Sequence, residues 1–199
     1  QITLVNTPEA YSGSAFLDFS TPVRPLGLTF SLGLRETGRK GISFVNDLPN
    51  TTTSVTHQFR IKLDNRKKKY FNVEIGSEVA ITRARYSIMD ALNTRYYSTT
   101  FFGTAHWTPN GRWDVRFSAD LTQYSNAGFG QSVNIPILTA GISYYFNTEK
   151  TAVLVLEGAD LLDRNTGYSR VTENNALQEI RSEVLGRYVM LSFRYRIKP

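Results

Sequence analysis

The chain has 199 residues, of which 41% are hydrophobic and 13% aromatic, and its formal net charge is +6. It contains no cysteine, which excludes disulfide scaffolds, thiol catalysis and cysteine-based metal sites. The length fits one domain, and no run approaches the roughly 20 apolar residues that a membrane-spanning helix requires.

The basic residues do not predict a nucleic-acid partner. Their only dense run, Arg66 to Lys69, falls in a predicted tight turn, where a solvated turn is the simpler interpretation. A nucleic-acid site would require basic residues gathered on one patch. The first five residues, Gln1 to Val5, lack the basic and apolar regions of a signal peptide.

Nine strands are predicted from alternating apolar and polar side chains, because successive side chains of a strand point to opposite faces. In chain order they cover residues 14–20, 26–36, 54–64, 70–82, 96–107, 113–122, 134–146, 151–159 and 186–199. The alternation is cleanest over residues 113–122, with Trp113, Val115, Phe117, Ala119 and Leu121 on one face. In the last strand the apolar face comprises Val189, Leu191, Phe193, Tyr195 and Ile197.

The connections are predicted to alternate between short turns and long loops. The predicted long loops cover residues 37–53, 83–95, 124–133 and 160–186. Up-and-down outer-membrane barrels have this alternation, with short periplasmic turns and long extracellular loops, whereas soluble sandwiches do not require it. The sequence therefore predicts an all-β, antiparallel, up-and-down transmembrane β-barrel segment. Asn174–Arg181 is the only candidate for a helix.

The charged residues around the turn near Lys67 predict a register. If this turn is centred on Lys67, Arg60 lies opposite Glu74, and Lys62 lies opposite Asn72. Opposite charges would then meet on the polar face, where each cross-strand pair stabilises the sheet by a fraction of a kcal/mol.

The sequence offers little for catalysis. Neither histidine, His57 nor His106, has partners at a spacing that suggests a triad, and no cluster of histidine and acidic residues indicates a metal site. His106 is expected to face inward and to form a structural hydrogen bond with Asp114. Glu74 and Glu78 share a face but stand about 13 Å apart, too far for paired-carboxylate chemistry. We expect no enzymatic activity, cofactor or metal.

Two sets of polar residues are candidates for function. The set expected to line the lumen comprises Arg35, Arg60, Glu74, Glu78, Arg116, Asp120 and Arg194. The set expected at the outer rim, as substrate-binding candidates, comprises Arg83, Arg85, Tyr86, Asn93, Arg95, Tyr124, Tyr168 and Arg170. Arginine and tyrosine at a rim suit polar or anionic ligands, although solubility alone explains any single exposed residue. Trp107 and Trp113, on the apolar face, suit an interfacial girdle or, alternatively, the core of a sandwich.

Three segments near the end of the chain form a recognisable series: DLLDRN at 160–165, YSRVTEN at 168–174 and VLGRYVMLSF at 184–193. The series resembles the closing segment of outer-membrane β-barrel domains of Bacteroidota, in the TonB-dependent receptor-like group. The resemblance is densest over residues 160–197 and looser at 41–44 and 85–87. Relatives tend to end on an aromatic residue, whereas this chain ends Ile197-Lys198-Pro199.

The resemblance implies that residues 1–199 are the C-terminal portion of an outer-membrane barrel domain. It implies TonB-dependent uptake of a nutrient such as a glycan, a peptide or a metal chelate. The implied partners are outer-membrane lipid and lipopolysaccharide, the remainder of the barrel and its plug, a TonB-type energy-coupling protein and a surface lipoprotein. An odd count of nine strands also predicts that the first and last strands pair outside this sequence.

Two alternatives remain open from the residues alone. The first is a small, self-contained outer-membrane barrel that acts as a porin or an adhesin. The second is a soluble β-sandwich that binds carbohydrate.

Overall fold

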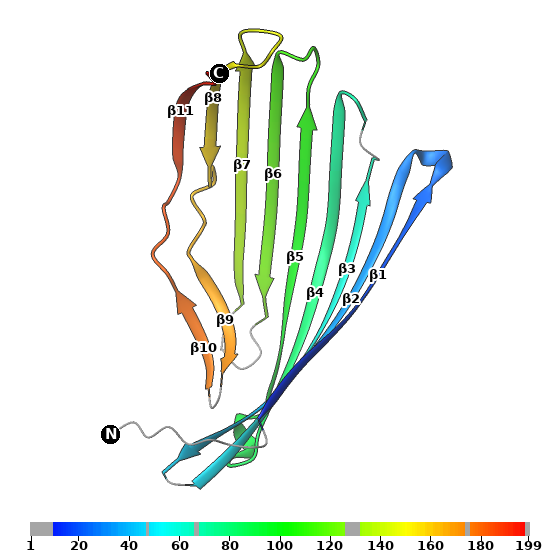
Figure 1. Ribbon diagram of the computed structural model, residues 1–199. Coiled ribbons are helices and arrows are strands. Elements are labelled where there is room, and N and C mark those ends of the chain that lie inside the picture. The colour runs from blue at the N-terminus through cyan, green and yellow to red at the C-terminus, as the bar shows by residue number, and fades with distance from the viewer. Residues whose placement is uncertain (1–9, 47, 66–67, 126–131, 174–175, 198–199) are drawn as a thin grey trace.

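Nine strands form one antiparallel sheet in chain order, as the computed structural model shows for residues 10–46, 48–65, 68–125, 132–173 and 176–197 (Figure 1). The strands are β1 (Tyr11–Val23), β2 (Leu28–Val45), β3 (Leu48–Asp64), β4 (Phe71–Tyr86), β5 (Thr94–Trp107), β6 (Trp113–Tyr124), β7 (Val133–Tyr145), β8 (Ala152–Ala159) and β11 (Tyr188–Tyr195). Strands β9 (Tyr168–Glu173) and β10 (Ala176–Arg181) form a separate hairpin. Two short 3₁₀ turns, Arg24–Leu26 and Asp90–Leu92, complete the elements. The prediction of an all-β, antiparallel, up-and-down arrangement is confirmed.

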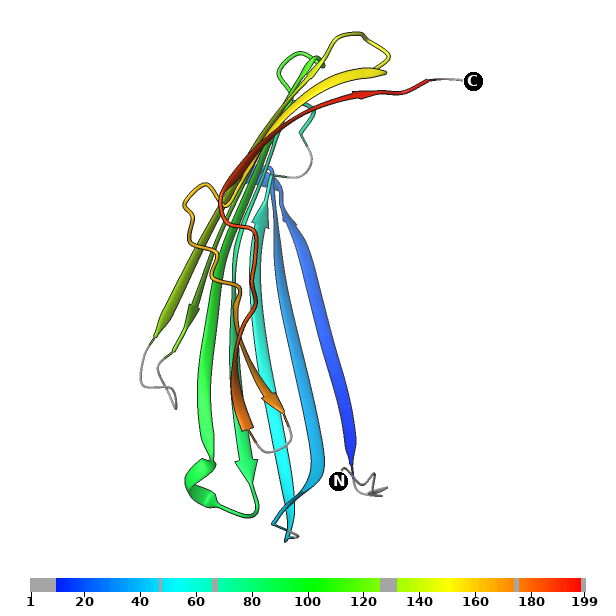
Figure 2. The same cartoon turned by 90° about the vertical axis from the view of Figure 1, so that its left-hand side faces the viewer.

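The sheet is open in the residues that the structure describes. Strand β1 pairs with β2 and lies at one edge, whereas β11 pairs with β8 and lies at the other (Figure 1). The sheet bends and twists along its strands, as Figure 2 shows from the side. These residues therefore do not close into a barrel by themselves. None of the helical segments in the described ranges is long and apolar enough to cross a membrane.

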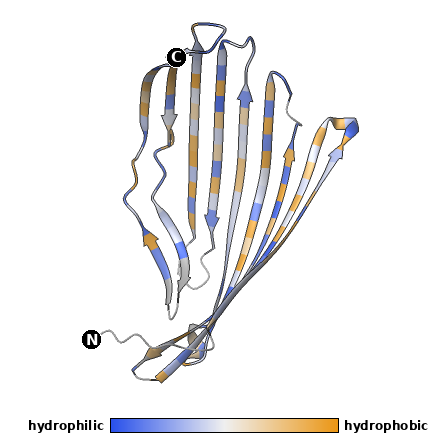
Figure 3. Cartoon of the chain, viewed as in Figure 1, coloured by the Kyte–Doolittle hydropathy of each residue, from blue (hydrophilic) through white to orange (hydrophobic). Residues whose placement is uncertain are grey.

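Outside the polar tip of the β2–β3 hairpin, the strands of the sheet present one apolar and one polar face, and the register carries this division across the sheet. Leu17, Leu34, Phe59 and Val79, for example, are successive partners on β1 to β4. Bands of hydrophobic and hydrophilic residues alternate along the strands (Figure 3). We call the side that carries Leu17, Phe59, Phe117 and Leu191 the apolar face, and the opposite side the polar face. The predicted alternation over residues 113–122 is confirmed, as is that of Val189, Leu191, Phe193 and Tyr195 in β11; Ile197 lies beyond the end of β11, which is shorter than predicted.

The apolar face is the exposed one. Leu17 is 64% exposed and Leu191 is 66% exposed. The buried hydrophobic side chains of the described residues lie instead on the polar face or on the hairpin; they are Ala84, Tyr86, Tyr96, Ile135, Val155 and Tyr168. An exposed apolar area of this extent is not expected of a soluble monomer.

The predicted loop at 37–53 is wrong, because β2 continues to Val45 and β3 begins at Leu48. The two strands stay paired from Thr29 opposite Asp64 to Val45 opposite Leu48. The outer part of this hairpin is rich in polar residues on both faces, so the alternation on which the prediction relied is lost there. The loop at 83–95 is also shorter than predicted, because β4 ends at Tyr86 and β5 begins at Thr94. The connections therefore do not alternate strictly between short and long.

The helix candidate Asn174–Arg181 is wrong over the part that the structure describes. Residues 176–181 form β10, paired with β9, so that Ile180 lies opposite Ser169 and Arg181 opposite Tyr168. Pairing with β9, which lies in the same predicted loop, determines the extended conformation of residues 176–181. The sequence of these residues alone does not indicate that pairing. Residues 174 and 175 lie outside the described ranges.

The predicted register between β3 and β4 is also wrong. Arg60 lies opposite Glu78 rather than Glu74, and Lys62 lies opposite Gly76 rather than Asn72. The side chain of Asn65 explains the shift: its Nδ2 donates to the carbonyl of Phe71 (2.8 Å), and its Oδ1 accepts from the amide of Val73 (3.0 Å). These bonds close a wider turn. Of the basic run in this turn, residues 66 and 67 lie outside the described ranges.

Candidate functional site

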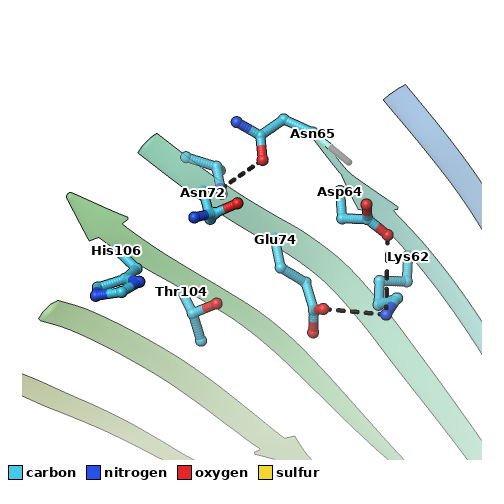
Figure 4. Close-up of a pocket in the computed structure, with 8 residues that line it drawn as sticks. Lys62, Asp64, Asn65, Asn72, Glu74, Thr104 and His106 are labelled. Atoms are coloured by element: carbon cyan, nitrogen blue, oxygen red, sulfur yellow. Dashed lines mark hydrogen bonds and ion pairs between the residues drawn. The ribbon is translucent and has the colours of Figure 1, made fainter. Parts of the chain in front are cut away.

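The polar face carries a charged depression of about 480 Å³ near the short turns (Figure 4). Lys62 Nζ lies 3.0 Å from Glu74 Oε2 and 4.0 Å from Asp64 Oδ2. Glu74 thus pairs with Lys62 diagonally across the two strands, and this contact replaces the predicted one with Arg60. The depression is lined by Lys62, Asp64, Asn65, Asn72, Val73, Glu74, Thr104 and His106.

A second polar chain on this face begins at His106. Its Nε2 lies 2.7 Å from Asp114 Oδ2, which confirms the predicted hydrogen bond. Asp114 Oδ1 lies 3.1 Å from Arg116 Nε, and Arg116 Nη2 donates to Ser143 Oγ at 3.2 Å. Arg116 separates the serine hydroxyl from the histidine. The four residues therefore lack the contact between nucleophile and base that defines a catalytic triad.

All seven residues predicted to line the lumen lie on the polar face; they are Arg35, Arg60, Glu74, Glu78, Arg116, Asp120 and Arg194. Glu78 accepts from Gln58 at 3.4 Å, and Asp120 accepts from Ser118 at 3.4 Å. The guanidinium group of Arg60 lies 4.7 Å from the centre of the Phe102 ring. Bonds to neutral and oppositely charged neighbours allow these groups to lie side by side on one wall.

The β9–β10 hairpin is bound to the far end of the polar face through Arg170. Its Nη1 donates to the backbone carbonyl of Ser125, at the end of β6, and its Nε donates to the hydroxyl of Tyr168. Arg170 Nη2 also lies 3.2 Å from Glu179 Oε1. The rings of Tyr124 and Tyr168 meet at 5.3 Å, centre to centre. We call this group the hairpin latch: Tyr124, Ser125, Tyr168, Arg170 and Glu179.

The hydroxyl of Tyr168 is central to the latch, because it accepts from Arg170 and donates to Glu179. Its burial raises the pKa of Tyr168, and the hydrogen bond to the Glu179 carboxylate raises the same pKa further. The neutral phenol is therefore the form that suits the latch. Sequence reasoning found Tyr124, Tyr168 and Arg170 but missed Ser125 and Glu179.

The structure divides the predicted rim residues into separate groups. Tyr86, Tyr124, Tyr168 and Arg170 belong with the polar face or the hairpin that covers it. Tyr96, on β5 between β4 and β6, joins them and is buried, although sequence reasoning missed it. The hydroxyl of Tyr86 is buried and has no hydrogen-bond partner in the described part of the chain.

The other four rim residues belong to the β4–β5 connection or to the apolar face. Asn93 closes the connection between β4 and β5: its Oδ1 accepts from the amide of Tyr86 at 2.8 Å, and its Nδ2 donates to Asp90 at 3.2 Å. Arg83, Arg85 and Arg95 lie on the apolar face, because they continue the alternation of Ile81 on β4 and Tyr97 on β5.

An aromatic row lies on the apolar face near the short turns. Trp113 contacts Tyr144 (ring centres 4.8 Å apart), and Tyr144 contacts Phe146 (5.1 Å). Trp107 and Trp113 are 49% and 42% exposed, respectively. Their predicted place on the apolar face is confirmed, and within these residues neither is packed into a core.

The described residues contain no group of three or more histidine, cysteine and acidic side chains placed to bind a metal ion. No family model matches the chain, and no curated protein or solved structure matches it. The polar wall and the rim are therefore interpreted from their own chemistry.

Proposed function

We propose that this chain forms part of the wall of an outer-membrane β-barrel that takes up a nutrient by TonB-dependent transport. The observation that carries the membrane assignment is the reversed exposure of the two faces: the apolar face is open, whereas buried side chains gather on the polar face. Hydrocarbon against one face and a water-filled interior against the other give each face a suitable solvent.

The height of the apolar face supports the same assignment. Phe71 and Ile81 are ten positions apart on β4, as are Tyr97 and Trp107 on β5. At the usual strand rise and a tilt of about 40°, ten residues span roughly 26 Å across a membrane. Outer-membrane barrels have an apolar band about 25 Å tall, flanked by aromatic girdles. The row that includes Trp113 and Tyr144 suits one such girdle.

The open edges of the sheet lead us to propose further strands. Unpaired backbone groups in hydrocarbon cost several kcal/mol each, so β1 and β11 require partners within the membrane. Strands outside this sequence would supply them, as the resemblance to TonB-dependent receptors implies. The polar face then lines the interior, and the tyrosine-rich end of that face, with the unpartnered hydroxyl of Tyr86, would contact a glycan, a peptide or a metal chelate.

Two experiments test this function in sequence. The full-length protein should be recovered from the outer-membrane fraction and should require detergent to remain monodisperse; a monodisperse protein without detergent would instead support the soluble sandwich. Uptake of a labelled substrate should then stop when the TonB-type energy-coupling protein is deleted. Uptake that continues unchanged would support a porin and remove the transport assignment, while leaving the barrel intact.

A further inference from the structure

Three arginines project from the apolar face at the end of the sheet that carries the hairpin latch. Arg83 and Arg85 extend β4 beyond Ile81, and Arg95 precedes Tyr97 on β5. All three are exposed. Arg83 and Arg95 are the first same-face residues beyond the apolar band and Arg85 is the second, so all three lie where a membrane-embedded face meets the headgroups of the surrounding lipid.

The arrangement concentrates positive charge without a compensating acid. Arg83 and Arg95 are direct partners across β4 and β5, and like charges in that position destabilise a sheet. In the described part of the chain, none of the three forms an ion pair with a carboxylate. Glu36, an acid of the same face, instead contacts His57 Nδ1 at 2.8 Å. The cationic cluster is thus open to an anion from outside the protein.

Tyr97 adds a second recognition element beside this cluster. The guanidinium group of Arg95 lies 5.0 Å from the centre of the Tyr97 ring, a cation–π contact on the apolar face. Guanidinium groups bind phosphate through paired N–H donors. An apolar surface on one side and a phosphate site on the other match an amphiphile that has acyl chains and a phosphorylated headgroup.

We propose that Arg83, Arg85 and Arg95 bind the phosphate groups of lipid A in the outer leaflet, with its acyl chains against the apolar face. The proposal rests on the proposed membrane location. It assigns the three arginines to lipid rather than to the transported substrate. Charge complementarity and the adjoining apolar surface support a phosphorylated lipid as the occupant, and the proposed location in the outer membrane makes that lipid lipid A.

The test uses the full-length protein in phosphatidylcholine nanodiscs that contain either phosphorylated or dephosphorylated lipid A. Lipid A that remains bound after transfer to detergent is quantified by mass spectrometry. The wild-type protein should retain the phosphorylated form preferentially, and the triple variant R83Q/R85Q/R95Q should bind it on the order of a hundredfold more weakly. The triple lysine variant should keep most of the affinity, because it keeps the charges.

Arg39 provides the matched control, because it is an exposed arginine on the opposite face of β2, beside Ser54 of β3. R39Q should leave lipid A retention unchanged. Equal retention by the wild-type protein and the triple glutamine variant would overturn the proposal, as would equal retention of the two lipid A forms.

Two further outcomes remain informative. A wild-type protein that does not enter nanodiscs at all would refute the proposed membrane function as well, which distinguishes that failure from a failure of the lipid site alone. If the triple variant does not fold, the pair R85Q and R39Q decides instead: R85Q should weaken retention by roughly fivefold. Equal retention by this pair would also overturn the proposal.

Discussion

The two faces of the nine-stranded sheet differ in composition and in exposure. The apolar face is the more exposed, and the buried side chains of the sheet lie on the polar face. Leu191 on the apolar face is 66% exposed, whereas Ser143 and Val155 on the polar face are 1% and 4% exposed. The β9–β10 hairpin lies over one end of the polar face, where the hairpin latch attaches it. A soluble sheet hides its apolar face, whereas here the apolar face is the more exposed one.

The largest expected effect comes from placing a charge on each face of the same strand. Phe117 and Ser118 are neighbours on β6, on the apolar and polar faces, respectively. Phe117→Arg should destabilise the protein by about 2–4 kcal/mol if the apolar face lies near the middle of a bilayer. Ser118→Arg should cost far less, because Asp120 lies on the same face. The folded fraction in lipid vesicles, measured from gel mobility before and after heating, checks this; equal losses would contradict the assignment of the faces.

A pair of glycines tests how tightly each face is packed. A Cβ atom on Gly76, on the polar face, would lie 2.3 Å from the Phe102 ring and 2.5 Å from the carbonyl of Ile61. On Gly103, on the apolar face, the nearest atom would be 3.6 Å away. Gly76→Ala should therefore destabilise by roughly 1–3 kcal/mol. Gly103→Ala should change stability by about 0.5 kcal/mol or less. Urea unfolding in vesicles measures both, and a larger loss at Gly103 would reverse the comparison.

The hairpin latch gives a more local effect. Arg170→Gln removes the bonds to Ser125 and Glu179 that attach the hairpin to the wall. Bonds to charged groups contribute about 1.5–3 kcal/mol, so hydrogen exchange in residues 168–173 should accelerate roughly 10-fold to 100-fold. Arg181→Gln is the control, because Arg181 is exposed and only stacks over Tyr168 at 5.9 Å. Unchanged exchange in the Arg170 variant would show that other contacts attach the hairpin.

The smallest effect concerns pH. Burial, and then the hydrogen bond to Glu179, raise the pKa of Tyr168 above its usual value of 10.0. The neutral phenol is thus favoured in the folded state, and its contribution to docking is fully present below pH 10 and is lost as the pH rises through the higher, folded-state pKa. Slow exchange in the hairpin should decline over that alkaline range, and Tyr168→Phe should remove this pH dependence. An identical decline in both proteins would assign the effect to another group.

The sequence predicted the faces well where one side of the sheet is apolar and the other is polar. Apolar and polar residues alternate from Trp113 to Leu121 because successive side chains of a strand point to opposite faces, and the observed register follows that alternation. Arg83 and Arg85 continue the alternation of Ile81, so the spacing indicates their place on the apolar face. They were predicted at the rim because residues 83–95 were predicted to be a loop, whereas β4 continues to Tyr86.

Alternation does not predict the structure where a strand is polar on both faces. It also does not predict the structure where pairing with another segment determines the conformation. Residues 37–45 and 48–53 extend β2 and β3 without an apolar stripe, so only their mutual pairing reveals them. Residues 176–181 become a strand because residues 168–173 pair with them. The latch depends on Arg170 reaching Ser125, 45 positions away, a contact that no local pattern shows.

Spin labels on the two faces report directly which solvent each face meets. The chain has no cysteine, so a single cysteine can be labelled at Val115 or Phe193 on the apolar face, and at Arg116 or Arg194 on the polar face. In lipid vesicles, labels at Val115 and Phe193 should collide mainly with dissolved oxygen, which concentrates in hydrocarbon. Labels at Arg116 and Arg194 should collide mainly with a water-soluble nickel chelate. Water access at Val115 and Phe193, with hydrocarbon access at Arg116 and Arg194, would reverse the assignment of the two faces.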